Sequence, residues 1–454
     1  MKAQGVITHT EGESNTSAAR ADWAARHPDA ATRDLLARDA GAFLHQSLSS
    51  PCLSTIAKAE GIWIEDTAGR RFMDFHGNSV HHVGYAHPRV VAAIKAQLDA
   101  LSFSPRRFTN AVSVDLAEAL GELAPGDLGK VLFTTGGSDA NEVALRLARA
   151  ATGRFKTLSF WDAFHGAGFG AASVGGEATF RSGIAGPLLP GAEHVAPFNC
   201  YRCAYGHPGP EACGLACAKM VDYVLEREGD VAAVIAEPMR AVPVVPPPGF
   251  WKAVRAACDR HGALLIMDEI PTGLGKTGAM FAFVHDEVVP DIVTLGKALG
   301  GGILPIAAVV ARRDLDVCGD FAIGHYTHEK NPVTARAALE TLAVIREEGL
   351  VARAAELGAH ALERLRVALG DCRIVGDIRG RGLMFGIEIV EDRDSRQAAK
   401  ERAERIHYRC LEAGLSFKIS AGCVLTLSPP LIIGRADLDR ALDIVAVAVR
   451  AEAG

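Results

Sequence analysis

Two stretches of the chain decide the fold: LLIMDEIPTGLGKTG at residues 264–278 and PDIVTLGKALGGG at residues 290–302. Each contains a short apolar run that ends near a charged side chain, Asp268 in the first and Lys297 in the second. Runs that are apolar on both faces are typical of strands in a parallel sheet covered by helices. Ligands of open α/β sheets bind beyond the carboxyl ends of the strands. The pattern therefore predicts that Asp268 faces a ligand and that Lys297 follows the next strand.

Similar apolar runs, each followed by a turn and a helical pattern, continue from residue 131 to about residue 311. They lie at residues 131–133, 157–160, 231–236, 263–267 and 292–295. This alternation predicts an α/β fold with a largely parallel sheet between helices.

The ends of the chain predict a second, smaller domain. Residues 61–66 and 71–75 alternate as in a hairpin. The later elements are a helix-rich stretch at residues 332–366, short strands at residues 384–390 and 424–427, and an amphipathic helix at residues 436–451. We expect an N-terminal arm (residues 1–60), a small α+β domain (residues 61–85 and 332–454) and a large domain (residues 86–331).

The composition excludes several classes of protein. The 454 residues are 49% hydrophobic and 22% charged, which excludes a disordered chain. A balance of 48 Lys+Arg against 54 Asp+Glu leaves no excess of positive charge for binding nucleic acid. The longest apolar run, residues 299–311, is too short to cross a membrane. Ten cysteines with no export signal before Ala18 indicate a cytoplasmic protein.

A glycine-rich turn precedes the first helix of the large domain. Gly136, Gly137, Ser138 and Asp139 lie between the run ending at Phe133 and a helical pattern. Small residues let backbone N–H groups at a helix start approach an anion, which the helix dipole also favours. The alternative is an ordinary helix start capped by Ser138 or Asp139. The turn lacks the GxGxxG and GK[ST] patterns of nucleotide sites.

Lys297 has the environment of an amine nucleophile. Burial disfavours the ammonium and lowers its pKa, which suits a lysine that forms an imine. The alternative is an ion pair with Asp268 or Glu269. A phosphate cradle, an acid for a pyridine nitrogen and an imine lysine together are what pyridoxal phosphate (PLP) requires. Phe164 could stack on such a planar cofactor, or be an ordinary core residue.

These motifs, in this order, resemble the class III PLP-dependent aminotransferases of fold type I. The family implies a large domain with a seven-stranded type of sheet and a small domain formed by both termini. The resemblance runs from about residue 61 to residue 430. It is carried by FTTGGSDANEVALRLAR (133–149), FHG (164–166), AEP (236–238), the two stretches quoted first, THEKNP (327–332), IRGRGLMFGIE (378–388) and LSPPL (427–431).

The resemblance also implies roles for individual residues. Lys297 would form the Schiff base and shuttle protons, and Asp268 would pair with the pyridine nitrogen. The other implied cofactor contacts are Gly137 and Ser138 at the phosphate, Phe164 and Ile270 on the two ring faces, Glu237 of the EP motif, and Thr327 at the neighbouring subunit's phosphate. The last contact implies an obligate homodimer, which could pair further into a tetramer.

The chain departs from the family pattern near the substrate. Family members that use 2-oxoglutarate commonly bind its carboxylate with an Arg that a Glu gates, and the positions of this Glu and this Arg are Val242 and Thr426 here. Pro271 replaces the usual Gln that donates to the cofactor's ring hydroxyl. An anionic substrate must then meet other bases. The candidates are Arg106, Arg107 and Arg240, which could instead be surface or interface residues.

Two activities follow from this resemblance. We expect an aminotransferase that moves the amino group of a small, anionic primary amine to an oxo acid. The stretches HGNSVHHVGY (76–85), PRRFTN (105–110) and HYTHEKNP (325–332) also resemble the branch that eliminates ammonia. Its members resemble (R)-1-hydroxy-2-aminoethylphosphonate ammonia-lyase or phospholyases of amino-alcohol phosphates. The intact Asp268 and Lys297 disfavour a third reading, a regulatory protein without catalysis.

A four-cysteine segment is not usual in the wider family. Cys200, Cys203, Cys213 and Cys217 lie within eighteen residues, with His207 between them. Such spacing predicts a structural zinc clamp on an inserted loop. The alternative is a set of partly buried thiols or disulfides formed on oxidation.

Overall fold

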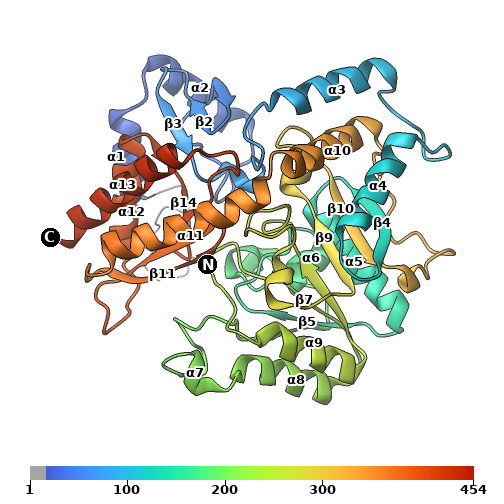
Figure 1. Ribbon diagram of the computed structural model, residues 1–454. Coiled ribbons are helices and arrows are strands. Elements are labelled where there is room, and N and C mark those ends of the chain that lie inside the picture. The colour runs from blue at the N-terminus through green and yellow to red at the C-terminus, as the bar shows by residue number, and fades with distance from the viewer. Residues whose placement is uncertain (1–16, 182) are drawn as a thin grey trace. The chain divides into compact units, whose positions relative to one another are not determined.

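The computed structural model describes residues 17–181 and 183–454 (Figure 1). Their contacts divide the chain into two compact units. Unit 1 covers Met1–Gly77 and Glu356–Gly454, and unit 2 covers Asn78–Ala355. The part of the predicted N-terminal arm before residue 17 lies outside the described residues.

Unit 2 is built on a seven-stranded sheet in the order β4-β10-β9-β8-β7-β5-β6. The strands are β4 (Leu128–Thr134), β5 (Lys156–Phe160), β6 (Ala192–Val195), β7 (Val231–Ala236), β8 (Leu264–Asp268), β9 (Ile292–Leu295) and β10 (Ala307–Arg312). All neighbours pair in parallel except β10, which runs antiparallel to both β4 and β9. Every residue of β7 and β8 is buried, as expected for strands covered on two faces.

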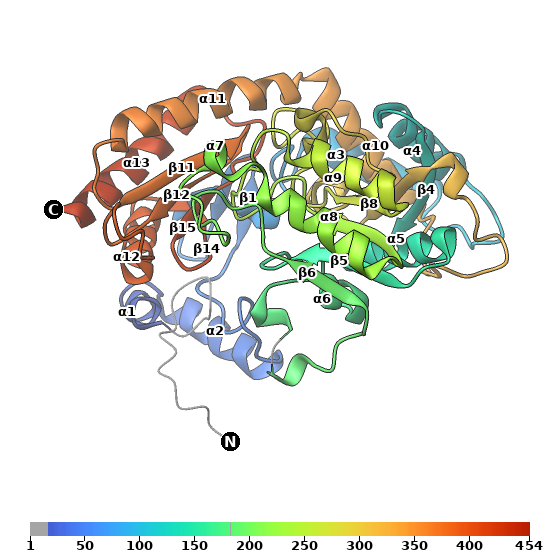
Figure 2. The same ribbon diagram turned by 90° about the horizontal axis from the view of Figure 1, so that it is seen from below.

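Helices cover both faces of this sheet. Helix α5 (Gly137–Thr152) lies on one face, and α8 (Ala216–Glu228) and α9 (Phe250–His261) lie together on the other (Figures 1 and 2). The remaining helices of unit 2 include α3 (Pro88–Ala100), α4 (Ala111–Leu123), α6 (Phe169–Val174), α7 (Pro210–Cys213) and α10 (Pro332–Glu347). The predicted α/β class with a largely parallel sheet is confirmed.

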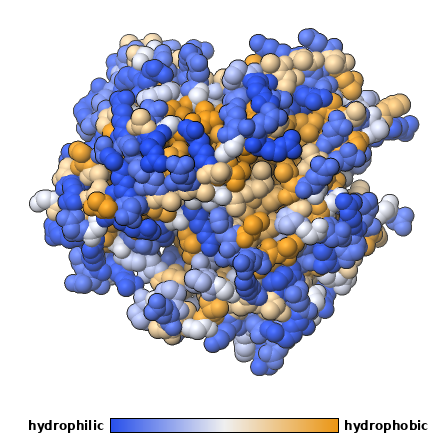
Figure 3. All heavy atoms as spheres, in the orientation of Figure 1, coloured by the Kyte–Doolittle hydropathy of each residue, from blue (hydrophilic) through white to orange (hydrophobic). Residues whose placement is uncertain are grey.

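Some large apolar side chains of unit 2 remain on the surface. Figure 3 shows apolar residues exposed on one face of the molecule, among a mostly hydrophilic surface. The exposed set in unit 2 includes Leu98, Leu101, Phe103, Phe108, Phe169 and Phe321. Exposed apolar residues in this number are typical of a surface that contacts a partner.

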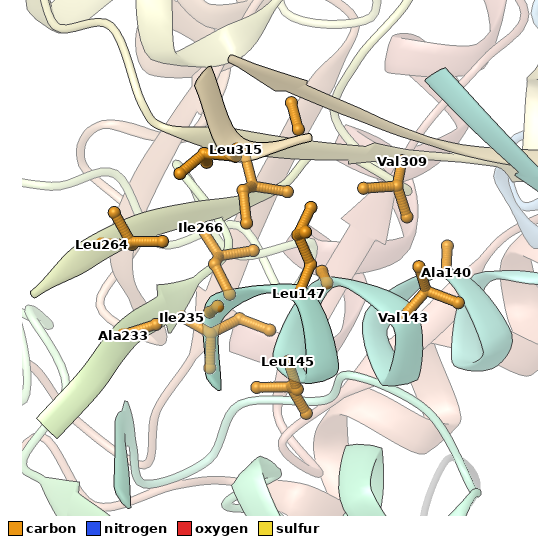
Figure 4. Close-up of a cluster of buried hydrophobic side chains, with 14 of the residues drawn as sticks. Ala140, Val143, Leu145, Leu147, Ala233, Ile235, Leu264, Ile266, Val309 and Leu315 are labelled. Atoms are coloured by element: carbon orange, nitrogen blue, oxygen red, sulfur yellow. The ribbon is translucent and has the colours of Figure 1, made fainter. Parts of the chain in front are cut away.

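The core of unit 2 lies between α5 and the sheet. Val143 and Leu147 of α5 belong to the same buried cluster as Ile235 of β7 and Ile266 of β8 (Figure 4). The α5 residues are four apart and therefore share a helix face, while the strand residues point to one side of the pleat. Helix α5 ends at Gly153, whose φ of 67° is left-handed and suits glycine. This packing fixes the start of α5 against the ends of the strands.

The strand ends place the predicted site residues at one edge of the sheet. Because β10 is antiparallel to both β4 and β9, those two strands point the same way as β5, β7 and β8. Their carboxyl ends therefore meet at a single edge. The sequence continues from these ends into Gly136, Phe164, Glu237, Asp268 and Lys297.

Unit 1 contains two four-stranded sheets, β1-β2-β3-β13 and β11-β12-β15-β14. The strands are β1 (Lys58–Glu60), β2 (Trp63–Glu65), β3 (Arg71–Asp74), β11 (Val375–Arg381), β12 (Met384–Ile389), β13 (Leu415–Ser416), β14 (Lys418–Ser420) and β15 (Val424–Leu427). Its helices are α1 (Ala18–Arg26), α2 (Ala30–Ala42), α12 (Lys400–Glu412) and α13 (Arg435–Ala453), and α11 (Leu350–Leu369) crosses the unit boundary. Trp23 of α1 is 2% exposed and packs with Phe72 and Tyr408.

The structure adds elements that the sequence patterns did not separate. Strand β10 covers the end of the apolar run at residues 299–311 and continues to Arg312, and the sequence analysis did not assign it as a separate strand. Helix α10, expected in the small domain, packs against α3 and α4 within unit 2. The division into arm, small domain and large domain stays a prediction. Among the described residues, no helix combines the length and apolarity of a membrane span.

Replacing Ile266 by Ala should destabilise unit 2, because Ile266 of β8 is fully buried in the cluster that packs against α5. We expect the free energy of unfolding to fall by about 2–5 kcal/mol, measured by urea unfolding followed by tryptophan fluorescence. Val367→Ala is the control, since Val367 is 75% exposed and its truncation should change stability by less than about 0.5 kcal/mol. Equal unfolding curves for the two variants would contradict this core.

Candidate active site

The turn after β4 forms an uncapped helix start. Gly136 is the N-cap of α5, and it has no side chain to satisfy the first N–H groups. Neither Ser138 nor Asp139 is the cap, so the alternative of a side-chain-capped start is wrong. Ser138 instead accepts a hydrogen bond from the Ala167 N–H at 3.1 Å. Free N–H groups at the start of a sixteen-residue helix are suited to an anion.

Two glycines allow three segments to meet at this helix start. A Cβ on Gly137 would lie 2.4 Å from Cδ1 of Ile270, and a Cβ on Gly166 would lie 2.3 Å from Oγ of Ser138. Gly166 also has a φ of 133°, which side chains rarely adopt. The turn after β4, the turn after β8 and the loop after β5 therefore approach more closely than any larger residue permits. This arrangement is a cradle for a phosphate with Ile270 beside it.

Asp268 is the last residue of β8 and is 2% exposed. Its Oδ2 accepts a hydrogen bond from Asn141 Nδ2 at 2.9 Å and lies 2.8 Å from His165 Nδ1. Its Oδ1 accepts from the Ile270 N–H at 3.1 Å. These donors hold the buried carboxylate in one orientation.

The donors to Asp268 are themselves held in place. Asn141 Nδ2 also donates to the His165 carbonyl at 2.7 Å, and Asn141 Oδ1 accepts from Thr294 Oγ1 at 2.8 Å. On the other ring nitrogen of His165, Nε2 lies 3.5 Å from Ser159 Oγ. Side chains from α5, β5, β9 and the loop after β5 thus fix one carboxylate. The sequence analysis missed Asn141, His165 and Thr294 as functional residues. Only the position of Asn141, one helical turn after Gly137, pointed toward the site.

Lys297 follows β9 in an unusual backbone conformation. Its φ is 45°, a left-handed value that is costly for a residue with a side chain. Lys297 is half-buried and lines a cavity of about 350 Å³ together with Val80, Gly136 and Ile303. Such strain persists where the surroundings hold a residue for function. The amine is thus presented to a cavity that also touches the phosphate cradle.

Glu269 serves the structure and not the site. Its carboxylate accepts from Thr272 Oγ1 at 2.7 Å and from the Phe283 N–H at 2.9 Å. Full burial raises the pKa of Glu269 to about 7. Burial also lowers the pKa of Lys276, in the same TG-rich segment, to about 7. Neighbouring acids in the sequence therefore have separate roles.

Glu237 follows β7 and is 6% exposed. Burial raises the pKa of Glu237, with the charge of Asp268 acting in the same direction and the charges of Arg240, His165 and Lys297 acting against it. These influences place the Glu237 carboxylate within electrostatic range of both Asp268 and Lys297. Glu237 thus belongs to the same constellation.

The remaining predicted cofactor contacts lie at different depths. Ile270 is 9% exposed beside Gly137. Phe164 is 37% exposed and its ring lies 4.5 Å from that of Phe180. Thr327 is exposed, in the segment before α10. Within this single chain nothing tests the partner contact expected of Thr327, which stays a prediction.

The three candidate arginines differ sharply. Arg106 and Arg107 are exposed, and Arg106 Nη1 lies 2.7 Å from Nδ1 of His325. Arg240 is 7% exposed and forms ion pairs with Glu177 at 3.1 Å and Glu237 at 3.5 Å. Of the three, only Arg240 is buried and adjoins the constellation around Lys297.

The expected zinc clamp is not supported. Within residues 17–181 and 183–454, no group of three or more His, Cys, Asp or Glu side chains is arranged to hold a metal ion. Cys200, Cys203, Cys213 and Cys217 line one narrow cavity as free thiols, and His207 does not complete a site. Burial raises the pKa of Cys217 to about 11, whereas zinc binds the thiolate. The alternative of partly buried thiols describes this segment.

Comparison with known proteins matches this geometry. The family model for class III aminotransferases covers residues 45–449. The (R)-1-hydroxy-2-aminoethylphosphonate ammonia-lyase of Vibrio splendidus is 43% identical over 97% of this chain and 95% of its own. The acetylornithine aminotransferase of Methanopyrus kandleri is 36% identical over 90% of this chain and 97% of its own.

Solved structures give the same answer for the fold. An amine transaminase from an uncultivated Pseudomonas species, in its PLP-bound form, has a TM-score of 0.85 and 32% identity over 91% of this chain and 99% of its own. The fold type I assignment is confirmed. The chain belongs to the class III aminotransferase family of PLP-dependent enzymes.

Proposed function

We propose that this enzyme is an ammonia-lyase acting on a small primary amine that carries a β-hydroxyl and a phosphonate, of the 1-hydroxy-2-aminoethylphosphonate class. The observation that carries the proposal is the 43% identity to such an ammonia-lyase across nearly the full length of both chains. The aminotransferase of Methanopyrus kandleri is 36% identical and matches less of this chain. The loss of the usual carboxylate clamp at Val242 and Thr426 agrees with a different anion.

The residues present fit PLP. The uncapped start of α5, with Gly137 and Ser138, would hold the phosphate, and Phe164 and Ile270 would lie on the two ring faces. Asp268 would face the pyridine nitrogen and hold its proton, since hydrogen bonds fix the Asp268 carboxylate in one orientation. PLP, when bound, supplies an electron sink that stabilises negative charge at the substrate's Cα. No other group in this arrangement could supply it.

Lys297 would move the proton in the reaction. Its neutral amine takes the proton from the carbon that bears the substrate nitrogen, as a general base. The β-hydroxyl then leaves with its electron pair as water, and the released enamine hydrolyses to an aldehyde and ammonia. The elimination releases one water and the hydrolysis of the enamine consumes one, so the net products are ammonia and a phosphonate-bearing aldehyde. Glu237 and Asp268 keep the surroundings of Lys297 polar and ordered.

Transamination is the second candidate, because the family model and the Methanopyrus relative favour it. The two reactions use the same cofactor contacts and the same first proton transfer. They differ in whether a β-substituent leaves or an oxo acid accepts the nitrogen.

We further propose a homodimer in which Thr327 contacts the cofactor phosphate of the partner subunit. Exposure of Thr327 and of the apolar side chains of unit 2 supports this, as does the family assignment. A tetramer would require a second interface. A cytoplasmic location is proposed from the ten free cysteines, which are typical of a reducing compartment.

The reaction itself is the first test. Purified enzyme with PLP and (R)-1-hydroxy-2-aminoethylphosphonate, without any oxo acid, should release ammonia and aldehyde in equal amounts. We would measure ammonia with glutamate dehydrogenase and the aldehyde as its hydrazone. Nitrogen release that depends on added pyruvate, with alanine as product, would instead select the transaminase.

Replacing Lys297 by Ala should lower kcat by about 10²–10⁴, the usual contribution of a general base. Borohydride reduction of the wild-type holoenzyme should label the peptide that contains Lys297. Lys130→Ala is the control, because the Lys130 side chain is 51% exposed in an ion pair with Asp316. Full activity in the Lys297 variant, or labelling of another peptide, would refute the assignment.

Replacing Gly137 by Ala should weaken PLP binding, because the new methyl group would overlap Cδ1 of Ile270. Overpacking of this kind costs about 1–3 kcal/mol, or about 5- to 150-fold in Kd. The measurement is a PLP titration of the apoenzyme by tryptophan quenching.

The double variant Gly137→Ala/Ile270→Val tests the cause of this loss. Valine lacks Cδ1, so affinity should return toward that of Ile270→Val alone. Wild-type affinity in the single Gly137 variant would show that the cradle lies elsewhere.

A further inference from the structure

A buried guanidinium lies beside the active-site constellation. Arg240 follows β7 and its backbone bridges to Val244. Its side chain is 9% exposed, which is unusual for a group that keeps its charge. A buried charge requires a counter-ion or hydrogen-bond partners. The contacts of this one side chain therefore indicate what it is built to hold.

Two carboxylates share Arg240. Nη2 donates to Glu177 Oε1 at 3.1 Å, and Nε lies 3.5 Å from Glu237 Oε2. Nη2 also donates to the carbonyl of Asp162. Nε is buried and makes no hydrogen bond. Among the described residues, Nε is therefore a buried donor that pairs with Glu237 by charge alone and stays open to a hydrogen bond.

The two carboxylates are not equivalent. Glu237 is buried at the end of β7 and is held by the backbone N–H of Ala241 at 3.4 Å. The Glu177 side chain is 32% exposed, and Glu177 lies at the N-cap of a short 3₁₀ turn, Ala178–Phe180. Arg240 keeps Glu237 as a counter-ion when Glu177 leaves, and solvent reaches the partly exposed Glu177 carboxylate, so Glu177 is the partner that an incoming anion can replace. Glu237 is the fixed partner and Glu177 the exchangeable one.

Arg240 is close to the reacting groups. Its fixed partner Glu237 lies within electrostatic range of Asp268 and Lys297. Its carbonyl partner Asp162 is two residues before Phe164. An anion that replaced Glu177 on Arg240 would therefore lie beside Glu237. Arg106 and Arg107 are solvated, so their charges are screened and bind a small anion more weakly.

We propose that Arg240 binds the anionic group of the substrate and that Glu177 is its counter-ion in the absence of substrate, displaced when the anion arrives. Guanidinium presents two parallel N–H groups to a phosphonate or carboxylate, which gives such a site orientation as well as charge. The choice of a phosphonate as the anion rests on the proposed function. Glu177 is a specificity-determining residue, since its departure is needed only for an anionic substrate.

A purely structural role is the competing explanation, because Arg240 joins the segments of Asp162 and Glu177. In that case substitutions at either end of the ion pair would lower thermal stability and would change anion binding only through unfolding. In the proposed role the two ends act in opposite directions on anion affinity. Removing the charge of Arg240 should therefore weaken anion binding, and removing the charge of Glu177 should strengthen it, which a purely structural role does not predict.

The test is calorimetric titration of methylphosphonate into PLP-loaded enzyme, in which the cofactor occupies the phosphate cradle. Arg240→Gln should weaken binding about tenfold or more, as expected for losing charge-assisted hydrogen bonds. Arg240→Lys should lie between this variant and wild type. Glu177→Gln should tighten binding about two- to fivefold, the range of a half-exposed ion pair.

The controls remove comparable charges elsewhere. Glu193→Gln removes a negative charge from β6 outside the Arg240 ion pairs, and should leave the Kd unchanged. Arg106→Gln and Arg107→Gln should also leave it unchanged. Thermal unfolding of each holoenzyme variant shows whether it is folded at the titration temperature.

Three results would overturn the proposal: wild-type enzyme that does not bind methylphosphonate, unchanged affinity in folded Arg240→Gln, or weaker binding in folded Glu177→Gln. These outcomes are independent of the reaction type. If methylphosphonate binds more weakly in the Arg240 variants but the enzyme releases no ammonia, the lyase activity is refuted and the anion site at Arg240 is supported. If the enzyme releases ammonia but its affinity for methylphosphonate falls in the Arg106 or Arg107 variants and not in the Arg240 variants, the lyase activity stands and the anion site at Arg240 is refuted.

Discussion

One buried carboxylate is the constraint on which the site depends. Asp268 is almost fully removed from solvent, and an ionised group there would be destabilising without its donors. Asn141 and His165 supply those donors, and Thr294 orients Asn141. Because these residues come from α5, the loop after β5 and β9, a single charge fixes three elements relative to β8. The rigid sheet edge that results is what holds a cofactor ring in one orientation.

Close backbone approach is the second requirement, and it explains where glycine is needed. Gly137 lets the start of α5 approach Ile270, and Gly166 lets the loop after β5 approach Ser138 of α5, at distances that a Cβ would not allow. The helix dipole and the free N–H groups are useful to a phosphate only when nothing caps them. In the proposed function, the positions that would admit the phosphate would also bring Ile270 to the side of the cofactor ring. Phosphate binding and ring placement are thus coupled through packing.

Local patterns predicted much of this arrangement because strands and their ends have simple signatures. The runs leading to Glu237, Asp268 and Lys297 are apolar on both faces, and parallel strands share an edge, so their meeting followed from topology. The network around Asp268 did not follow, since His165 and Asn141 meet it only in three dimensions. The prediction of a zinc site at the four cysteines was wrong for a related reason. Spacing predicted four ligands, but burial keeps Cys217 a protonated thiol within a cavity of free cysteines.

The cofactor contacts set what can happen at one carbon, while the departures from the family pattern set which molecule arrives there. The carboxylate clamp expected at Val242 and Thr426 is missing on both sides, and a buried arginine stands two residues before Val242. Arg240 cannot reproduce the missing clamp by position, since its partners are Glu177 and Glu237. An anion bound to Arg240 would lie beside Glu177 and Glu237, near the end of β7. In the proposed function, the substrate's anion therefore meets a different positive charge while Lys297 keeps the same first proton transfer.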